Sequence, residues 1–387
     1  MYPSTPKMNA STRILLTGGG SGGHVYPLLA VADALKKFGG GQGLNLNLYY
    51  VGPKDSYAKI LSEKGIDVRG IPAGKLRRYL SIENIFDIPK IIFGLIAALW
   101  TVFWIMPDAI FSKGGTGALS VVVAGWFYRI PIIIHESDAT PGLTNLLSAR
   151  FASRIAVGFE SALAYFNPKK TALVGAPVRE ELLAGRLASE TAKEQLGFDP
   201  KEPLMLILGG SQGSERINQF ILANLENLAK EAQILHQTGV ANFQEAEKLS
   251  RAALLSVPVK TAAVRRYRAV PYLEDDYKAA LSAADLVIAR AGSGTINEIA
   301  AFGIPAILIP LLESANDHQR LNAYEFAKTG AAVVIEEENL LPGLFLNQLK
   351  SVIKNPETLG KMSAASAKFF KPGAAEIIAQ EIMRMAA

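Results

Sequence analysis

The sequence contains no cysteine among its 387 residues. This absence excludes disulfides, thiolate nucleophiles and metal sites with cysteine ligands, and it fits a reducing compartment, for which we expect the cytoplasm. Histidine is also scarce, with four residues, and no pair of them has zinc-site spacing such as H-E-x-x-H. The N-terminal stretch lacks the apolar core of a signal peptide. We therefore expect no metal centre and no signal peptide.

Long hydrophobic runs are rare, and one stands out. It begins at Ile91, ends at Met106 and carries no charge. As a helix it would span roughly 24 Å, which is less than the ~30 Å hydrocarbon core of a membrane. Two interpretations stay open: a helix buried in an α/β domain, or a helix with one face against a membrane surface. Trp100 and Trp104 lie four residues apart, as interfacial anchors often do.

Apolar residues make up 49% of the chain, which is enough for about two domains with their own cores. The charge is distributed unevenly. Residues 1–177 carry 18 Lys and Arg against 10 Asp and Glu, a net charge of +8, whereas the remainder has a net charge of −3. The first part therefore favours an anionic partner. Charge alone does not choose among nucleic acid, a phosphorylated substrate and an anionic membrane.

Short apolar runs alternate with helix-like stretches in both halves of the chain. In the first half they include RILLT, LNLNLYYVG, DAIFS and IPIIIHE, and in the second LMLIL, AQILHQ, ADLVIA and AAVVIEE. Such alternation predicts parallel sheets with right-handed crossovers. We predict an α/β protein of two doubly wound, Rossmann-like domains, at residues 1–177 and 178–365.

Four glycine-rich turns each follow a predicted strand and precede a predicted helix. They are residues 18–23, 114–117, 209–213 and 292–295. The unpaired amide N–H groups and the helix dipole at such turns favour phosphate binding. Four of them, divided between two domains, predict phosphate groups in a cleft between the domains. Plain tight turns are the alternative for any single one.

Glycine-rich turns also occur in NAD- or FAD-dependent enzymes and in P-loop NTPases. Gly18, Gly20 and Gly23 satisfy the G-x-G-x-x-G pattern of NAD and FAD enzymes, but the next predicted strand ends in YYVGP, without the acidic residue that binds a ribose. No P-loop motif occurs. The string Glu274-Asp275-Asp276 could hold a metal, but a helix N-terminal cap explains it more simply.

Single residues beside the turns suggest specific roles. His24 lies at a predicted helix N-terminus, where the dipole favours a neutral imidazole that can accept a proton; a hydrogen bond to a loop carbonyl is the alternative. Glu298 lies one turn into a predicted helix and could accept hydrogen bonds from a ribose diol, or merely compensate the dipole. Arg179, at the predicted domain junction, could bind a diphosphate or be an ordinary surface arginine.

Several motifs occur together in one order: GGGSGGHVYPLLAVADAL, GGTGALS, HESDATPGLTN, GAPVR, GGSQGSERIN, AGSGTINEIAAFGIPAILIP and NDHQRLNA. Between about Arg13 and Glu336 they resemble the family 28 glycosyltransferases, which have the GT-B fold. These bacterial enzymes transfer GlcNAc from UDP-GlcNAc to the 4-hydroxyl of MurNAc in lipid I (undecaprenyl-pyrophosphoryl-MurNAc-pentapeptide), and so make lipid II for peptidoglycan. The resemblance implies two Rossmann-like domains with a cleft between them.

In that family the first domain binds the acceptor and the second binds the UDP-sugar. The resemblance implies a final helix, at about residues 366–387, that packs back on the first domain. It also implies inversion at the anomeric carbon, with no cofactor and no metal. Other enzymes of the same fold, above all a UDP-GlcNAc 2-epimerase, remain an alternative. An NAD or FAD oxidoreductase and a non-catalytic nucleotide-sugar sensor are further alternatives.

The resemblance further implies site residues. On the acceptor side, His24 would act as or near the general base, assisted by Glu136 or Asp138. Contacts with sugar or acceptor are implied for Ser21, Gly22, Gly23, Asp138 and Asn145. Donor contacts are implied for Arg179, Ser211, Leu273, Ser293, Gly294, Thr295, Glu298 and Gln319. Asp138 stands where a common form of the family has asparagine, so its role is an open question.

Within that set, Leu273 would meet uracil through its backbone, Glu298 would bind the ribose, and Gln319 would bind GlcNAc hydroxyls. Arg179 and Ser211 would contact the diphosphate or the nucleoside, and residues 293–295 would surround the α-phosphate. Family members also carry an apolar patch ringed by basic residues that associates with the membrane. Here the run from Ile91 to Met106 has Lys75, Arg77, Arg78 and Lys90 nearby, which predicts a peripheral protein on the anionic cytoplasmic face of the cell membrane. We expect no nucleic acid as a partner.

Overall fold

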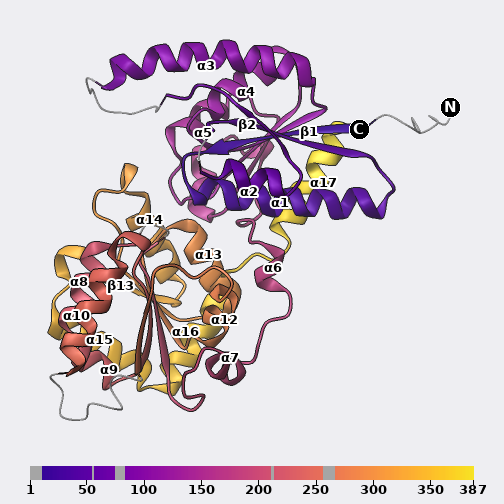
Figure 1. Ribbon diagram of the computed structural model, residues 1–387. Helices are drawn as coiled ribbons and strands as arrows, with labels where there is room; N and C mark the ends of the chain where they lie inside the picture. Colours follow the sequence, from indigo (N-terminus) through magenta and orange to yellow (C-terminus); the bar gives the residue numbers. More distant parts are fainter. Residues whose placement is uncertain (1–10, 55, 75–82, 211–212, 256–265) are drawn as a thin grey trace. The chain divides into compact units, whose positions relative to one another are not determined.

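The computed structural model describes residues 11–54, 56–74, 83–210, 213–255 and 266–387 (Figure 1). The chain divides into two compact units. The first comprises the residues up to Arg179 together with 373–387, and the second comprises residues 180–372. The chain thus leaves the second unit seven residues later than the predicted position, because helix α16 (Pro356–Phe369) packs against α13 (Ser293–Phe302) of that unit.

The first unit is built on a seven-stranded sheet with the order β3-β2-β1-β4-β5-β6-β7. Every strand pair in it is parallel. The strands are β1 (Thr12–Gly19), β2 (Leu46–Gly52), β3 (Asp67–Gly70), β4 (Ala109–Gly115), β5 (Ile132–Glu136), β6 (Arg154–Val157) and β7 (Thr171–Leu173). Ile14 and Leu16 face one hydrophobic core while Leu15 faces another, so helices cover both faces of the sheet.

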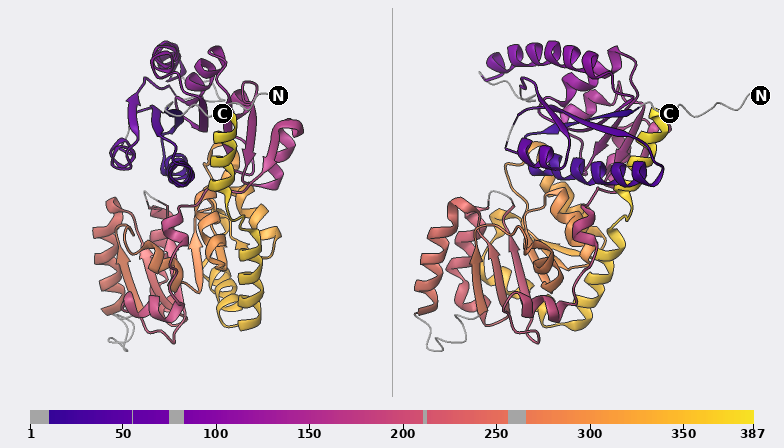
Figure 2. Two further views of the ribbon diagram at one scale, coloured as in Figure 1. Left: turned by 90° about the vertical axis from the view of Figure 1, so that its right-hand side faces the viewer. Right: turned by 45° about the vertical axis from the view of Figure 1, so that its right-hand side comes forward.

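Two groups of helices form those two cores (Figures 1 and 2). The first contains α1 (Gly22–Gly41), α2 (Ala58–Glu63) and α17 (Ala374–Ala386). The second contains α3 (Glu83–Ile105), α4 (Ala118–Phe127) and α5 (Leu143–Ser148). Short 3₁₀ helices η1 (Glu160–Tyr165) and η2 (Pro168–Lys170) precede β7. The C-terminal helix α17 packs against α1 and contributes Ile378 and Ile382 to the core of this unit.

The second unit is built on a six-stranded parallel sheet with the order β10-β9-β8-β11-β12-β13. Its strands are β8 (Leu204–Leu208), β9 (Gln233–Gln237), β10 (Tyr267–Val270), β11 (Leu286–Ala289), β12 (Ala306–Leu308) and β13 (Ala332–Val334). Its helices are α6 (Glu180–Leu183), α7 (Ser189–Gln195), α8 (Glu215–Ala223), α9 (Leu225–Ala229), α10 (Phe243–Leu255), α12 (Tyr277–Ala283), α13, α14 (His318–Lys328), α15 (Pro342–Ile353) and α16. The described part of the unit also contains the 3₁₀ helices η3 (Val240–Asn242), η4 (Ala315–Asp317) and η5 (Glu337–Asn339). The prediction of two doubly wound α/β domains is confirmed.

The four glycine-rich turns lie where the strand order of each sheet reverses. In the first sheet the chain order reverses between the neighbouring strands β1 and β4, and in the second between β8 and β11. Two of the turns follow β1 and β4, and the other two follow β8 and β11. Ligands of open α/β sheets bind at such switch points, outside the carboxyl ends of the strands. Each unit therefore carries a pair of glycine-rich turns where its fold predicts a ligand.

Helix α3 has one buried face and one exposed apolar face. Ala98, Val102 and Ile105 are buried in the core, against α4 and the sheet. Six large apolar side chains on the outside are between 49% and 65% exposed: Ile92, Phe93, Ile96, Trp100, Phe103 and Trp104. The interpretation of this helix as wholly buried is therefore wrong. Among the described residues, no helix combines the length and apolarity needed to cross a membrane.

Candidate functional site

The turn after β1 places Ser21 and His24 at the start of α1. Ser21 is the N-cap residue, and its Oγ lies 2.9 Å from Nδ1 of His24. A side chain at Gly22 would clash, because its Cβ would lie 2.9 Å from the ring of Tyr26. The amide N–H groups of Gly22 and Gly23 find no hydrogen-bond partner in the described part of the chain. They are thus positioned to bind an anion at the helix N-terminus.

The turn after β4 packs against the first one. Gly115 has a φ of +84°, and a Cβ there would lie 3.1 Å from Cδ2 of His24. Gly20 has a φ of +88° and lies close to Thr116, whose Oγ1 would be 3.1 Å from a Cβ at position 20. Only glycine combines these backbone conformations with so little space. The two turns, far apart in sequence, therefore pack against each other, and the second one lies against the ring of His24.

Glu136 ends β5 as a buried carboxylate. Its Oε1 accepts a hydrogen bond from the Asp138 amide (3.0 Å), and its Oε2 accepts from the Gly142 amide (3.1 Å) and from Nδ2 of Asn145 (2.9 Å). Burial and the charge of Asp138 raise the pKa of Glu136, whereas the charge of Lys113 and the hydrogen bonds from the Asp138 amide and Asn145 oppose the shift. Because both oxygens are occupied, Glu136 braces the loop that carries Asp138 and Asn145.

Lys113, at the end of β4, was not singled out by the sequence. Its side chain is buried, and Nζ donates a 2.8 Å hydrogen bond to Oγ of Ser137. Burial lowers the pKa of Lys113, while the charges of Glu136 and Asp138 act in the opposite direction. The available signal was a lysine directly after the predicted strand DAIFS. Lys113 thus joins the turn after β4 to the loop after β5.

Arg179 and His135 are two further polar residues of the first unit. The Arg179 guanidinium lies 4.6 Å from the ring centre of Tyr26, and its buried Nε has no hydrogen-bond partner in the described part of the chain. His135 lies at the end of β5, where Nε2 donates to the Gly175 carbonyl (2.8 Å). Burial, together with the charge of Lys113, lowers the pKa of His135 to about 3. The ring of His135 is therefore neutral.

In the second unit, the turn after β8 is joined to Leu273 through one glutamine. Nε2 of Gln237 donates to the Gly210 carbonyl (3.1 Å), and its Oε1 accepts from the Leu273 amide (3.0 Å). Leu273 can therefore offer a ligand its carbonyl oxygen but not its N–H. Ser211, predicted to contact the donor, lies outside the described residues. Gln237 was not singled out by the sequence, since its role depends on the pairing of β9 with β8.

The turn after β11 opens α13, and Ser293, Gly294 and Thr295 form its first turn after the extended N-cap residue Gly292. One turn further on, Oε2 of Glu298 accepts a 2.7 Å hydrogen bond from the hydroxyl of Tyr277, the first residue of α12. The sequence did not single out Tyr277. The expected N-cap position of the acidic string is confirmed for Asp276, although its side chain makes no capping hydrogen bond. The described residues contain no cluster of three or more His, Asp or Glu side chains suited to a metal.

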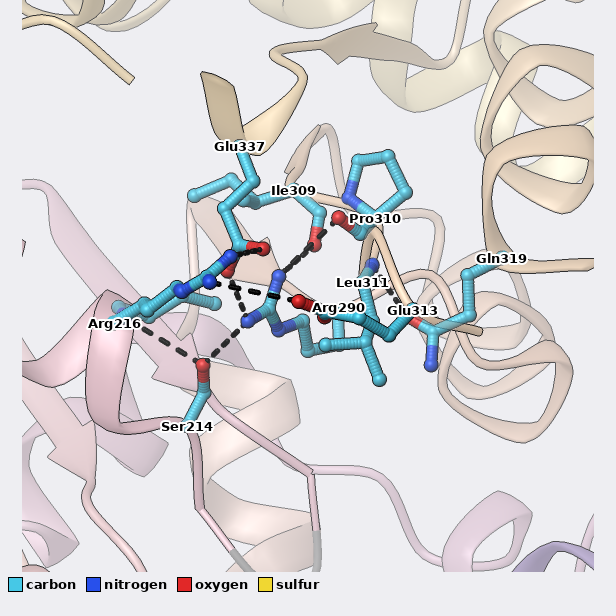
Figure 3. Close-up of polar contacts among 10 residues, drawn as sticks. Ser214, Arg216, Arg290, Ile309, Pro310, Leu311, Glu313, Gln319 and Glu337 are labelled. Carbon is cyan, nitrogen blue, oxygen red and sulfur yellow. Dashed lines mark hydrogen bonds and ion pairs between the residues drawn. The ribbon is translucent and has the colours of Figure 1, made fainter. Parts of the chain in front are cut away.

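Gln319, at the start of α14, lies beside a network of charged residues (Figure 3). Its Oε1 accepts a 3.0 Å hydrogen bond from the Leu311 amide. Arg290, which follows β11, is 9% exposed and donates to the carbonyls of Ile309 and Pro310 (3.2 Å each). Its other terminal nitrogen donates to Oγ of Ser214 (2.8 Å) and to the carboxylate of Glu337.

Two doubly wound units, each with paired glycine-rich turns at the switch point of its sheet, define a protein of the GT-B class. The model of the glycosyltransferase family 28 N-terminal domain matches residues 14–157, and that of the family 28 C-terminal domain matches residues 204–378. The chain belongs to glycosyltransferase family 28. The family predicted from the motifs is thus confirmed.

Individual relatives are similar over nearly the whole chain. A Clostridium tetani protein is 35% identical over 368 residues, which are 95% of this chain and 96% of that protein. It is named UDP-N-acetylglucosamine–N-acetylmuramyl-(pentapeptide) pyrophosphoryl-undecaprenol N-acetylglucosamine transferase. A Bacillus cereus protein with the same name, numbered 2, is 38% identical over 351 residues, which are 90% of this chain and 92% of that protein.

Solved structures agree with this grouping. The crystal structure of Acinetobacter baumannii MurG has 26% identity and a TM-score of 0.73, and the match covers 96% of this chain and 99% of that one. A UDP-GlcNAc 2-epimerase from Neisseria meningitidis has a TM-score of 0.66 but only 12% identity, over 97% of this chain and all of that one. The epimerase therefore shares the fold alone.

Proposed function

We propose that this chain transfers GlcNAc from UDP-GlcNAc to the 4-hydroxyl of MurNAc in lipid I, which gives lipid II. The observation that carries the proposal is the similarity, across both domains, to relatives named for this reaction. The first unit supports it with His24 and with the amide N–H groups of Gly22 and Gly23, which the turn after β1 leaves for an anion. The second unit supports it with the Glu298 carboxylate and the N-terminus of α13 after β11, and with the side-chain amide of Gln319 at the start of α14.

On the acceptor side, His24 removes the proton of the acceptor hydroxyl. The hydroxyl oxygen forms a bond to the anomeric carbon of GlcNAc, the bond from that carbon to the diphosphate breaks, and UDP departs with inversion of configuration. Proton uptake at Nε2 requires the tautomer of His24 that carries the ring proton on Nδ1. In that tautomer the Nδ1–H group donates a hydrogen bond to Oγ of Ser21, 2.9 Å away. The amides of Gly22 and Gly23 bind the acceptor pyrophosphate or the donor sugar.

The loop after β5 forms the rest of the acceptor side. Asp138 and Asn145 contact the sugar or the acceptor, and Asp138 assists proton removal. Glu136 acts on them indirectly, because its carboxylate holds the Asp138 amide and the Asn145 side chain in place. Its contribution is therefore positioning rather than proton transfer.

On the donor side, each group of UDP-GlcNAc has a partner. The carbonyl of Leu273 accepts from uracil, and Glu298, oriented by Tyr277, binds the ribose hydroxyls. The N-terminus of α13, at Ser293, Gly294 and Thr295, binds the α-phosphate. The diphosphate is also bound by Arg179 and Ser211, and Gln319 binds the GlcNAc hydroxyls. No cofactor and no obligatory metal take part.

The exposed face of α3 binds the anionic cytoplasmic surface of the cell membrane, so the protein is peripheral. Six large apolar side chains on that face are exposed to solvent. They belong to the part of the sequence with net charge +8, and Lys90 adds a cation at the start of the run. Apolar burial together with attraction to anionic headgroups is the usual basis of interfacial binding. The chain would thereby reach an acceptor whose lipid stays in the bilayer.

Radiolabelled sugar transfer tests the proposed reaction. Purified protein is incubated with UDP-GlcNAc labelled in the sugar and a lipid I analogue. We expect label in the lipid product and release of UDP only when the acceptor is present. Conversion of UDP-GlcNAc to its 2-epimer without acceptor would instead identify an epimerase. No turnover with tight UDP-GlcNAc binding would identify a sensor.

A further inference from the structure

Arg290 is a buried cation whose hydrogen bonds converge on two backbone segments of the second unit. One terminal nitrogen donates to the carbonyls of Ile309 and Pro310, at 3.2 Å each. The other donates to Oγ of Ser214, at 2.8 Å, and to the carboxylate of Glu337. Arg290 thereby links the segment after β12 to the N-cap residue of α8, which ends the glycine-rich turn after β8.

The segment fixed by Arg290 in turn fixes Gln319. The amide of Leu311, the residue after Pro310, donates to the Gln319 side chain at 3.0 Å. A backbone N–H only donates, so the side-chain atom that meets it is the oxygen. The amide nitrogen of Gln319 then points away from Leu311, as Figure 3 shows, and it has no hydrogen-bond partner in the described part of the chain. The side chain is therefore arranged to donate to a ligand.

The charge of Arg290 is balanced locally. Burial alone would raise the pKa of Glu337, but hydrogen bonds and charges from Arg290 and Arg216 outweigh it and hold the pKa below its usual value. Arg216 reaches the second oxygen of the same carboxylate at 2.7 Å. Glu337 is therefore ionised, and the guanidinium remains neutralised without a ligand. This leaves Arg290 free to serve as a structural clamp rather than as a phosphate contact.

We propose that Arg290 is a positioning residue for the donor sugar: it clamps the backbone at Ile309 and Pro310 so that Gln319 presents its amide nitrogen to a sugar hydroxyl. The inference rests on the proposed function, in which Gln319 binds GlcNAc. Lysine cannot replace the arginine, because a single ammonium does not serve the carbonyl pair and the pair formed by Ser214 and Glu337 at once. Arg290 thus acts on the sugar and not on the UDP moiety.

Binding calorimetry with UDP and with UDP-GlcNAc separates these two contributions. The quantity of interest is the ratio of the Kd for UDP to the Kd for UDP-GlcNAc, relative to the wild type. In Arg290→Lys we expect UDP to bind within about twofold of the wild type and the ratio to fall about three- to tenfold, the loss of one hydrogen bond. Gln319→Ala should lower the ratio to the same extent. The double variant should lower it no further, because the two residues act in series.

Two further variants sharpen the result. Arg216→Gln is the matched control, since it removes a cation from the same carboxylate but touches neither Ile309 nor Pro310, and its ratio should be that of the wild type. Gln319→Glu keeps an oxygen for Leu311 and replaces the donor group by an acceptor, so its ratio should fall as in Gln319→Ala. This variant decides the inference even if Arg290→Lys does not fold: an unchanged ratio overturns it.

Other outcomes also overturn the inference. Equal losses for UDP and UDP-GlcNAc in a folded Arg290→Lys protein would show a general structural role. Additive effects in the double variant would show that Arg290 does not act through Gln319. The proposed function fails in a different way, namely when the wild type neither binds UDP-GlcNAc nor transfers its sugar to a lipid I analogue.

Discussion

The hydroxyl of Tyr277 donates a 2.7 Å hydrogen bond to Oε2 of Glu298. This bond orients the carboxylate that we expect to bind the ribose, and it joins α12 to α13. Tyr277→Phe should therefore weaken UDP binding about two- to tenfold, the usual net effect of one hydrogen bond. Glu298→Ala should weaken it further, because both ribose contacts are lost. Isothermal titration with UDP measures both effects.

The second unit offers a matched control for this prediction. The hydroxyl of Tyr324, on α14, donates to Glu336, in the segment after β13, at 2.8 Å, which is a similar tyrosine–glutamate pair. Tyr324→Phe should leave the Kd for UDP unchanged. Equal weakening in the two tyrosine variants would argue against the assignment of Glu298 to the ribose.

The pair formed by Ser21 and His24 should control proton transfer. His24→Ala should lower kcat about 10²- to 10⁴-fold, the usual contribution of a general base. Ser21→Ala should lower it less, since the imidazole remains and only the partner of its Nδ1 is lost. Both variants should bind UDP like the wild type. Unchanged turnover in His24→Ala would remove this residue from the mechanism.

His236 should make the second unit sensitive to acid. Its Nε2 lies 3.0 Å from Oδ1 of Asn218 and its Nδ1 lies 3.0 Å from the hydroxyl of Tyr267, so the neutral ring satisfies both partners. Burial lowers the pKa of His236 to about 3, against 6.5 for an unperturbed histidine. Between pH 6.5 and 3, the unfolded chain therefore binds a proton at His236 that the folded chain does not bind. The resulting stability is fully present above pH 6.5 and is lost as the pH falls from 6.5 toward 3.

Unfolding experiments at two pH values test this effect. Between pH 7.5 and 5.0, His236 alone should cost about 2 kcal/mol of unfolding free energy. His236→Phe should lose that part of the pH dependence, whatever its stability at pH 7.5. His318, whose Nδ1 bonds to the Ala315 carbonyl in an exposed position, supplies the control, because His318→Gln should keep the wild-type dependence. The same acid response in wild type and His236→Phe would contradict the prediction.

The exposed face of α3 should determine membrane binding. Phe93 and Trp100 are 64% and 65% exposed, and their joint replacement by serine removes two apolar anchors without opening the core. We expect binding to vesicles with anionic lipids to fall at least about tenfold. Activity on a short-chain, soluble acceptor should remain. Sedimentation with vesicles measures the first effect.

Val240 provides the control for this surface. It is 72% exposed in the second unit, and Val240→Ser should leave vesicle binding unchanged. Equal vesicle binding by the wild type and the α3 double variant would show that the exposed face of α3 does not determine membrane binding.

Local features of the site could be predicted from the sequence, whereas the partners that hold them could not. Ser21 and His24 are three residues apart, so one helix turn brings them together. Lys113 and Ser137 are 24 residues apart, and Arg290 and Ser214 are 76 apart. Those pairs form only because parallel strands end at a common edge, and neither motif nor spacing specifies which strands are neighbours.

The glycine-rich turns and α3 likewise have local features that the sequence predicts and packing partners that it does not. Each glycine-rich turn is visible as a strand, a glycine cluster and a helix, but their arrangement as two pairs depends on the strand order of each sheet. From Ile91 onward the sequence of α3 is apolar on every side, so periodicity does not indicate which face is buried. Packing against α4 decides that Ala98 and Val102 lie inside and that Trp100 lies outside.

The most direct test of the proposed reaction is transfer of radiolabelled GlcNAc from UDP-GlcNAc to a lipid I analogue by the purified chain, with wild type and His24→Ala side by side. We predict acceptor-dependent formation of a labelled β-linked product by the wild type, and a loss of about 10²-fold or more in the variant. Release of UDP without acceptor at the same rate, or no labelled product from a wild type that binds UDP-GlcNAc, would contradict it.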